Sequence, residues 1–191
     1  MANCANCGIA IPEGRGVVIP GKDKKSPNVI LCSGCAQNIE QAFQAETEGA
    51  NPAGGLLFGL GAAIVSSLVW YGVVVLTKYE LGILAVGVGW LVGQAVMLGA
   101  GRKRSTLLQV MSVAITVAAM VSSEYLIVRY FVAQALAERG VTDLALLLPL
   151  NLVVEMIIEG IKASPLTLLF WAIAVWQAFV IPAPRRLKRV N

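Results

Sequence analysis

Residues 55–76 read Gly-Leu-Leu-Phe-Gly-Leu-Gly-Ala-Ala-Ile-Val-Ser-Ser-Leu-Val-Trp-Tyr-Gly-Val-Val-Val-Leu. This stretch of 22 residues contains no charged side chain. An α-helix needs about 20 mainly apolar residues to cross the hydrocarbon core of a bilayer. The stretch therefore predicts a transmembrane helix, and it decides the fold class because a soluble core needs no apolar run of this length.

Three further stretches have the same character. Leu81–Ala100 and Ala163–Pro184 carry no charge, and Ser105–Val128 is interrupted by Glu124 alone. The whole chain is 57% apolar and 14% charged, whereas ordinary globular domains are about 25% charged. We therefore expect a mainly α membrane protein with four transmembrane helices in a domain spanning residues 51–184.

The basic residues predict the orientation of these helices, because Lys and Arg are enriched in cytoplasmic loops. A cytosolic N-terminus places most of the 15 basic residues inside: Arg15, Lys22, Lys24, Lys25, Arg102, Lys103, Arg104, Arg185, Arg186, Lys188 and Arg189. The remainder lie outside or at the outer interface: Lys78, Arg129, Arg139 and Lys162. We expect four crossings, both termini in the cytosol, and a basic cytosolic tail over residues 185–191.

Two pairs of glycines have the spacing that lets membrane helices approach closely. Gly55 and Gly59 open the first stretch, and Gly89 and Gly93 lie inside the second. The pairs could form an interface between copies of the chain or pack helices within one four-helix bundle. The sequence leaves both interpretations open.

Three glutamines lie four or five residues from the predicted cytoplasmic end of their helices: Gln94, Gln109 and Gln177. At similar depth they could bond to one another and hold the helices in register. They could also line a polar vestibule. Both readings make them candidate polar residues of the membrane domain.

Glu124 is the single acid inside a predicted span, and an acid in a membrane segment is a candidate functional residue. It lies 19 residues beyond Ser105, or about 28 Å along a helix that rises about 1.5 Å per residue. We therefore expect an interfacial carboxylate near the outer surface. Trp70, Tyr71 and Tyr79 are typical of aromatic anchors at that surface.

Residues 141–162 differ from the predicted spans, because Pro149 breaks an apolar run that is too short to cross. Asn151, Glu155, Glu159 and Lys162 follow at helical spacing and define one polar stripe. This pattern predicts an interfacial or re-entrant helix. Glu155 and Glu159 could line a cation pathway, or they could form the solvated face of that helix.

The N-terminal 50 residues contain two cysteine couples, Cys4-Ala5-Asn6-Cys7 and Cys32-Ser33-Gly34-Cys35. Two Cys-x-x-Cys turns supply four sulfur ligands in the tetrahedral geometry that zinc accepts. In a reducing compartment this spacing favours a metal over disulfides; a redox dithiol pair and an iron site are the alternatives. We predict a Cys4 zinc-finger domain over residues 1–50 that holds structural Zn²⁺.

Composition also predicts the local structure of this domain. Short β-prone runs at Val17–Ile19 and Val29–Leu31 favour hairpins, and Ala36–Glu48 has helical composition. A second cysteine couple that opens into a helix resembles a treble-clef or B-box-like zinc finger more than an all-β ribbon, and we expect a treble-clef or ribbon-like domain. Residues 1–52 have no early apolar stretch, so we expect no cleaved signal peptide.

Charge and composition exclude several functions. Residues 1–54 have four basic and five acidic side chains, so we expect no nucleic-acid binding. The chain has no histidine, which excludes histidine-based zinc catalysis and Ser–His or Cys–His nucleophiles. A zinc ion with four cysteine ligands has no open position for substrate. We expect no catalytic residues and no enzymatic activity.

Several motifs resemble an uncharacterised group of bacterial inner-membrane proteins that join a zinc-ribbon or B-box-like module to a four-span region. The motifs are the two cysteine couples, residues 87–96 (Gly-Val-Gly-Trp-Leu-Val-Gly-Gln-Ala-Val), the basic turn over residues 99–104, and Ser123-Glu124-Tyr125. The resemblance covers roughly residues 1–135. It implies a prokaryotic inner-membrane location and supplies no activity.

These features favour a non-enzymatic membrane adaptor or accessory subunit. Its cytosolic zinc finger would bind a partner, and its helices would contact lipid and assemble with themselves or with a membrane complex. The alternative is a small homo-oligomeric channel or transporter for cations or small solutes, using Glu124, Glu155, Glu159 and the glutamines.

Overall fold

The computed structural model of the chain describes residues 2–12, 14–19, 28–79, 82–140, 154–155, 158–159, 162 and 166–185. It divides into two compact units, one of residues 1–49 with 184–191 and one of residues 50–183. Five helices lie in the described residues, together with four short strands. The fold is therefore mainly helical, as the sequence predicts.

The first unit contains two antiparallel hairpins and a helix. Strand β1 (Ala2–Asn3) pairs with β2 (Ala10–Ile11), and β3 (Val17–Ile19) pairs with β4 (Val29–Leu31). Helix α1 (Ser33–Thr47) begins directly after Cys32. The predicted hairpin of Val17–Ile19 with Val29–Leu31 is confirmed, and the predicted helix starts three residues earlier than composition indicated.

The core of the first unit is small. Its buried residues are Cys4, Ile11, Leu31, Cys35 and Ala36. Two of these five are cysteines, so apolar burial contributes little to the folding of this unit. A domain of this size depends on cross-links or a metal for stability.

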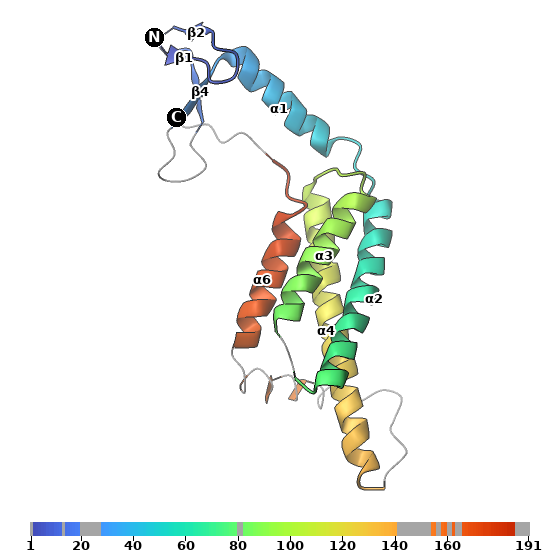
Figure 1. Cartoon of the computed structure of the whole chain (residues 1–191). Helices are drawn as coiled ribbons and strands as arrows, with labels where there is room; N and C mark the ends of the chain where they lie inside the picture. Colours follow the sequence, from blue (N-terminus) through green and yellow to red (C-terminus); the bar gives the residue numbers. More distant parts are fainter. Residues whose placement is uncertain are drawn as a thin grey trace. The chain divides into compact units, whose positions relative to one another are not determined.

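The second unit is a bundle of four helices (Figure 1): α2 (Pro52–Thr77), α3 (Ile83–Gly99), α4 (Thr106–Ala137) and α6 (Leu166–Val180). Side chains define where two of them begin. The Asn51 side chain accepts a hydrogen bond from the Gly54 N–H at 3.0 Å, and Ser105 accepts one from the Leu108 N–H at 3.2 Å. Both are N-caps that satisfy free backbone donors of the first turn.

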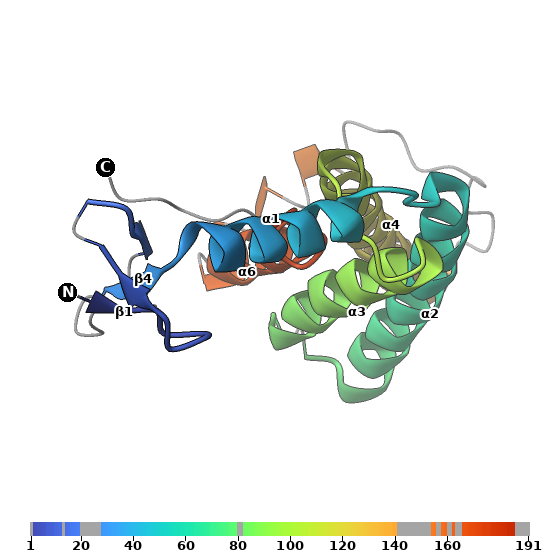
Figure 2. The same cartoon turned by 90° about the horizontal axis from the view of Figure 1, so that it is seen from above.

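Helices α3 and α4 form the centre of the bundle and contact each other, while α2 and α6 lie at opposite corners (Figure 2). Gly89 of α3 faces Ala174 of α6, and Gly93 faces Ala178. The matching order of these contacts means that α3 and α6 run in the same direction. This agrees with a bundle in which α2 and α4 run in one direction and α3 and α6 run in the opposite direction.

Helices α2 and α4 are long and apolar enough to cross a membrane, with 26 and 32 residues. Helices α3 and α6 are also apolar but have only 17 and 15 residues. Two helices therefore meet the length requirement, whereas the sequence predicted four of adequate length.

The bounds of α4 also differ from the prediction. The apolar stretch ends at Val128, but the helix continues to Ala137. The residues after Val128 include no Gly or Pro before Gly140, which has a positive φ of 76°. The end of the apolar stretch is thus a hydropathy boundary and not the end of the helix.

The predicted interfacial or re-entrant segment at 141–162 lies largely outside the described residues. Its described members Val154, Glu155, Ile158, Glu159 and Lys162 are helical and exposed. The Lys162 ammonium lies 2.6 Å from the Glu159 carboxylate. Glu159 is therefore part of an exposed ion pair.

Candidate metal centre

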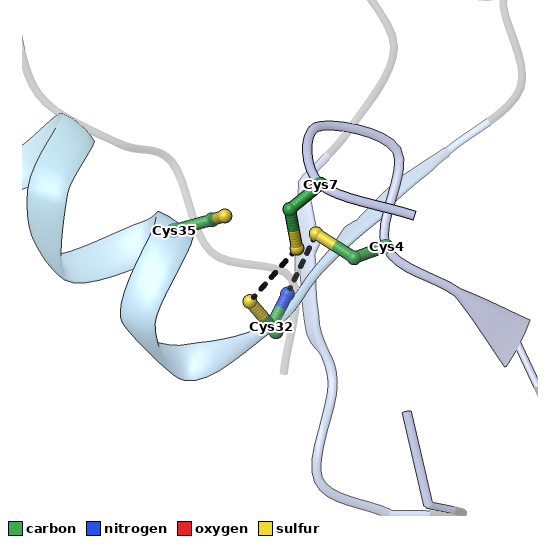
Figure 3. A group of neighbouring side chains, drawn as sticks. All are labelled: Cys4, Cys7, Cys32 and Cys35. Atoms are coloured by element: carbon green, nitrogen blue, oxygen red, sulfur yellow. Dashed lines mark hydrogen bonds between the residues drawn. The ribbon is translucent and has the colours of Figure 1, made fainter. Parts of the chain in front are cut away.

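Four cysteine side chains from three parts of the first unit converge on one point (Figure 3). Cys4 follows β1, Cys7 lies in the turn before β2, Cys32 follows β4, and Cys35 lies in the first turn of α1. Their sulfur atoms all lie within 4.8 Å of one another. The four predicted ligands are brought together as the Cys-x-x-Cys spacing requires.

Backbone hydrogen bonds form the first cysteine turn. The Cys4 N–H donates to the Ile9 carbonyl and the Gly8 N–H donates to the Cys4 carbonyl, each at 2.9 Å. Gly8 has φ of 74°, a conformation that glycine adopts without the steric cost of a Cβ. The Ala5 N–H donates to the Ile30 carbonyl at 3.0 Å, which fixes this turn against β4.

Two N–H groups donate to sulfur within the cluster. The Cys32 backbone N–H lies 3.3 Å from Cys4 Sγ, and the Asn6 side-chain amide lies 3.5 Å from Cys35 Sγ. Such donors stabilise the negative charge of a thiolate. Asn6 was not a predicted site residue; its position between Cys4 and Cys7 is the signal that could have identified it.

The surroundings shift the pKa values of Cys4 and Cys35 in opposite directions. Hydrogen bonds from the backbone N–H groups of Cys32 and Cys7 lower the pKa of Cys4 to about 6. At Cys35 the Asn6 amide lowers the pKa, but the neighbouring Cys32, Cys7 and Cys4 side chains and burial outweigh it and raise the pKa to about 12. Four thiolates this close repel one another, so full ionisation of the cluster needs a cation.

The sulfur spacing suits a tetrahedral metal site. Cys7 Sγ lies 3.8 Å from Cys32 Sγ, and Zn–S bonds of about 2.3 Å place tetrahedral sulfur ligands about 3.8 Å apart. A disulfide needs an S–S distance of about 2.05 Å, and all four cysteines are free thiols. The cluster therefore has the geometry of a metal site.

The glutamines of the bundle occupy different surroundings. Gln109 is buried and its amide donates to the Phe179 carbonyl at 3.0 Å, which joins α4 to the last turn of α6. Gln94 and Gln177 are half-buried, and Gln177 Oε1 has no hydrogen-bond partner in the described part of the chain. The Gln109 amide thus bonds to the backbone, whereas a bond between glutamines is one of the two arrangements that their similar predicted depth allows.

The four glycines lie at helix contacts within the bundle. A Cβ at Gly55 would meet Leu108 at 3.1 Å, and one at Gly59 would meet Val96 at 2.6 Å. A Cβ at Gly93 would meet Ile181 at 2.9 Å, and one at Gly89 would meet the backbone of Ala174. These contacts favour packing within one chain over an interface between copies.

Glu124 is only 7% exposed and lies on the inner face of α4. Trp70 is 1% exposed and belongs to the bundle core, so its interpretation as an interfacial anchor is wrong. Neighbouring helices cover it, which hydropathy alone does not reveal. Tyr79 is exposed, and Tyr71 packs edge-on against Tyr130 at a centroid distance of 6.1 Å.

Two basic residues make specific contacts at the ends of the bundle that their charge alone does not predict. The Arg104 guanidinium donates to the carbonyls of Ile181 and Ala183 at 2.7 and 3.3 Å. The Lys78 ammonium lies 4.9 Å from the centroid of the Tyr130 ring. The sequence offers one signal for each contact. Arg104 comes directly before an N-cap residue, and Lys78 comes directly after an apolar helix.

No family model, curated protein or solved structure matches this chain. The class of protein is therefore defined by its own features. It is a mainly helical protein with two helices apolar and long enough to cross a membrane and a four-cysteine cluster near its N-terminus.

Proposed function

We propose that this protein is a non-enzymatic integral membrane adaptor or accessory subunit. Its cysteine module binds a partner protein, and its helical bundle anchors or assembles a membrane complex. The observation that carries this proposal is the convergence of four cysteine sulfurs within 4.8 Å. Four sulfur ligands complete a tetrahedral shell and leave no position at which a metal could activate substrate.

The metal in this proposal is structural Zn²⁺, held by Cys4, Cys7, Cys32 and Cys35. Four thiolates at tetrahedral spacing are a ligand set that zinc prefers. The arrangement of a cysteine turn on one hairpin, a second hairpin and two cysteines at the start of a helix is typical of treble-clef zinc fingers. Zinc would supply folding free energy that the small core lacks.

The location in this proposal is a bacterial inner membrane. Only 33% of the apolar stretch of α2 is buried, whereas a core helix of a soluble protein is mostly buried. Leu57, Phe58 and Ile64 of α2 are each at least 60% exposed. A continuous exposed apolar surface of this kind is suited to lipid.

The proposed topology has four crossings and both termini in the cytosol. The basic turn between α3 and α4 supports it, because basic residues favour the cytoplasmic side. Helices α3 and α6 would span about 26 and 23 Å at about 1.5 Å per residue, against a hydrocarbon core of about 30 Å. Local thinning of the bilayer or flanking apolar residues would accommodate this difference.

In this proposal the cysteine module binds a partner protein through an exposed apolar side chain. Ile9 follows the first cysteine turn and is 63% exposed, the largest exposure of a large apolar side chain in the described part of the first unit. Exposed apolar residues beside a rigid turn are suited to act as anchors in a partner's pocket.

Affinity purification from the native membrane in mild detergent tests the adaptor role. The variant Cys32→Ser removes a metal ligand, Ile9→Ser removes the exposed apolar group but keeps the ligands, and Ser33→Ala is the control. We expect one partner at fixed stoichiometry with wild type and Ser33→Ala, and at least tenfold less with the other two. Equal recovery with all four proteins would contradict the adaptor role.

A second candidate function is a small channel or transporter. The observation that favours it is the burial of Glu124, Gln109, Ser112, Thr116 and Ser123 along one helix of the bundle. Glu155 and Glu159 would then attract cations at the outer mouth. Cation flux into liposomes that contain either wild type or the double variant Glu155→Gln, Glu159→Gln tests this function. Equal cation flux into both kinds of liposome and into empty liposomes would exclude it.

A further inference from the structure

The four cysteines of the metal centre differ in their exposure to solvent. Cys4 and Cys35 are buried, whereas Cys7 is exposed and Cys32 is half-buried. Each Cys-x-x-Cys couple therefore contributes one buried thiol and one more exposed thiol. Oxidation of a cysteine depends on the exposure of its thiolate, so an oxidant in solution reaches Cys7 before the other three.

The N–H donors within the cluster follow the same division. The Cys32 backbone N–H donates to Cys4 Sγ at 3.3 Å, and the Asn6 amide donates to Cys35 Sγ at 3.5 Å. A hydrogen bond to a thiolate stabilises its negative charge, and a more stable thiolate is a weaker nucleophile. Burial and these two hydrogen bonds thus protect the same two sulfurs, those of Cys4 and Cys35.

The exposed thiol has a neighbour with which it can form a bond. Cys7 Sγ lies 3.8 Å from Cys32 Sγ, and the two residues are 25 positions apart in the chain (Figure 3). A disulfide has an S–S distance of about 2.05 Å, so the sulfurs must approach each other by about 1.8 Å. Cys7 lies in an exposed turn and Cys32 at the N-cap of α1. A disulfide between them would join the first hairpin to the start of that helix.

We propose that Cys7 and Cys32 form an oxidation site at which hydrogen peroxide converts the metal centre into a disulfide. The Cys7 thiolate attacks one oxygen of the peroxide, so that an S–O bond forms, the O–O bond breaks and hydroxide leaves. The Cys32 thiolate then attacks the sulfur of the Cys7 sulfenic acid, forms the S–S bond and expels a second hydroxide. The two sulfurs together lose two electrons, and the peroxide gains them.

The disulfide would remove two of the four metal ligands, because its sulfurs no longer carry negative charge. Only Cys4 and Cys35 would remain as thiolate ligands, which is half of the set that holds structural zinc. Loss of the metal would unfold the small module and with it the exposed surface at Ile9. Since this site is the zinc centre of the proposed function, the inference rests on that function and adds its regulation: peroxide releases the partner, and a thiol reductant restores binding.

Peptide mapping of the purified full-length protein tests the proposal. The zinc content is measured first, and the zinc-loaded protein is then treated with a small molar excess of hydrogen peroxide. A chromophoric chelator follows the released zinc, and free thiols are alkylated before digestion and mass spectrometry. We expect one disulfide, between Cys7 and Cys32, one zinc ion released for each disulfide, and recovery of both thiols and zinc binding with dithiothreitol and added zinc.

Two variants separate the reacting sulfur from its surroundings. Cys7→His keeps four ligands in a Cys3His set, which zinc also accepts, and it should release zinc at least about tenfold more slowly because the first reacting sulfur is gone. Ser33→Ala changes an exposed residue beside Cys32 and should release zinc at the rate of wild type. If Cys7→His does not bind zinc, the disulfide map of wild type decides alone.

The outcomes distinguish this proposal from the proposed function. A disulfide within one couple, Cys4 with Cys7 or Cys32 with Cys35, would overturn the proposal while the zinc centre stands. Zinc that stays bound after peroxide, or equal release from Cys7→His and wild type, would do the same. A chain that carries no zinc before peroxide is added would contradict the structural zinc of the proposed function, and the oxidation site with it.

Discussion

Gly87 and Gly89 lie two residues apart on α3 but in different surroundings. A Cβ at Gly89 would lie 2.7 Å from the Cα of Ala174 on α6, whereas a Cβ at Gly87 would meet nothing within 4 Å. Backbone cannot move aside as a flexible side chain can. The close approach of α3 to α6 therefore requires glycine at position 89 and not at position 87.

We predict opposite effects of alanine at these two positions. Gly89→Ala should destabilise the bundle by about 1–3 kcal/mol through overpacking. Gly87→Ala should stabilise it by about 0.5–1 kcal/mol, because alanine loses less conformational entropy in a helix. Thermal unfolding in detergent, followed by tryptophan fluorescence, measures both. A loss of stability at position 87 as large as at position 89 would contradict the packing of α3 against α6.

The acidity of the cysteines predicts how metal affinity depends on pH. With its pKa raised to about 12, Cys35 carries a proton at neutral pH in the metal-free protein, and a metal must displace that proton. Cys4, with its pKa lowered to about 6, is already ionised above that pH. Lower pH therefore weakens binding, by at least about tenfold per pH unit.

Competition with a chromophoric zinc chelator between pH 6.5 and 8.5 measures this dependence. An affinity that does not change with pH would show that metal binding displaces no proton. The Asn6→Leu variant is informative because it removes the amide that donates to Cys35 Sγ at 3.5 Å. It should weaken metal binding at every pH in this range.

Individual residues differ in how far the sequence predicts them. The four clustered cysteines follow from their spacing in two couples, because a Cys-x-x-Cys turn directs both thiols to one side. The role of Trp70 does not follow, because its burial depends on which helices surround it. Asn6 lies inside the first cysteine couple, which marks it as a neighbour of the site, but its bond to Cys35, 29 positions away, follows only from the fold.

At the scale of elements, hydropathy predicts where apolar helices lie but not where they end. The N-cap of α4 at Ser105 agrees with the sequence, because a serine before an apolar run is a recognisable start. Its end at Ala137 does not, because polar residues continue a helix as well as apolar ones do. Conversely, α3 ends at Gly99, one residue before the predicted boundary.

Arg104 joins two elements, since it donates to carbonyls beyond the end of α6 from a position just before α4. We predict that Arg104→Met destabilises the bundle by about 1.5–3 kcal/mol, the usual contribution of hydrogen bonds to a charged group. Arg102→Met, two residues away and exposed, is the matched control and should have little effect. Chemical unfolding of both variants in micelles measures the difference, and equal stability would contradict this role of Arg104.

At the scale of the whole molecule, the division into two units predicts separate responses to metal removal. A strong chelator should unfold residues 1–49, because their buried core includes two of the cysteines. The helices of residues 50–183 should remain folded, since their core contains no cysteine. Hydrogen exchange with mass spectrometry measures this: α1 should lose protection while α2, α3, α4 and α6 keep theirs.

The sequence predicts a two-part organisation, because a polar cysteine-containing segment and an apolar segment differ sharply in composition. It does not predict which helices are neighbours. The pairing of Gly89 and Gly93 with Ala174 and Ala178 depends on contacts between residues about 85 positions apart. The same glycine spacing would equally permit close packing between helices of two different chains.

The central claim is that the four cysteines hold one structural zinc ion. Native mass spectrometry of the full-length protein, released from detergent, tests it most directly through the mass of each chain with its bound metal. We predict one zinc ion per chain in wild type and none in Cys32→Ser. A chain without metal, or one whose mass shows two disulfides in place of zinc, would contradict the claim.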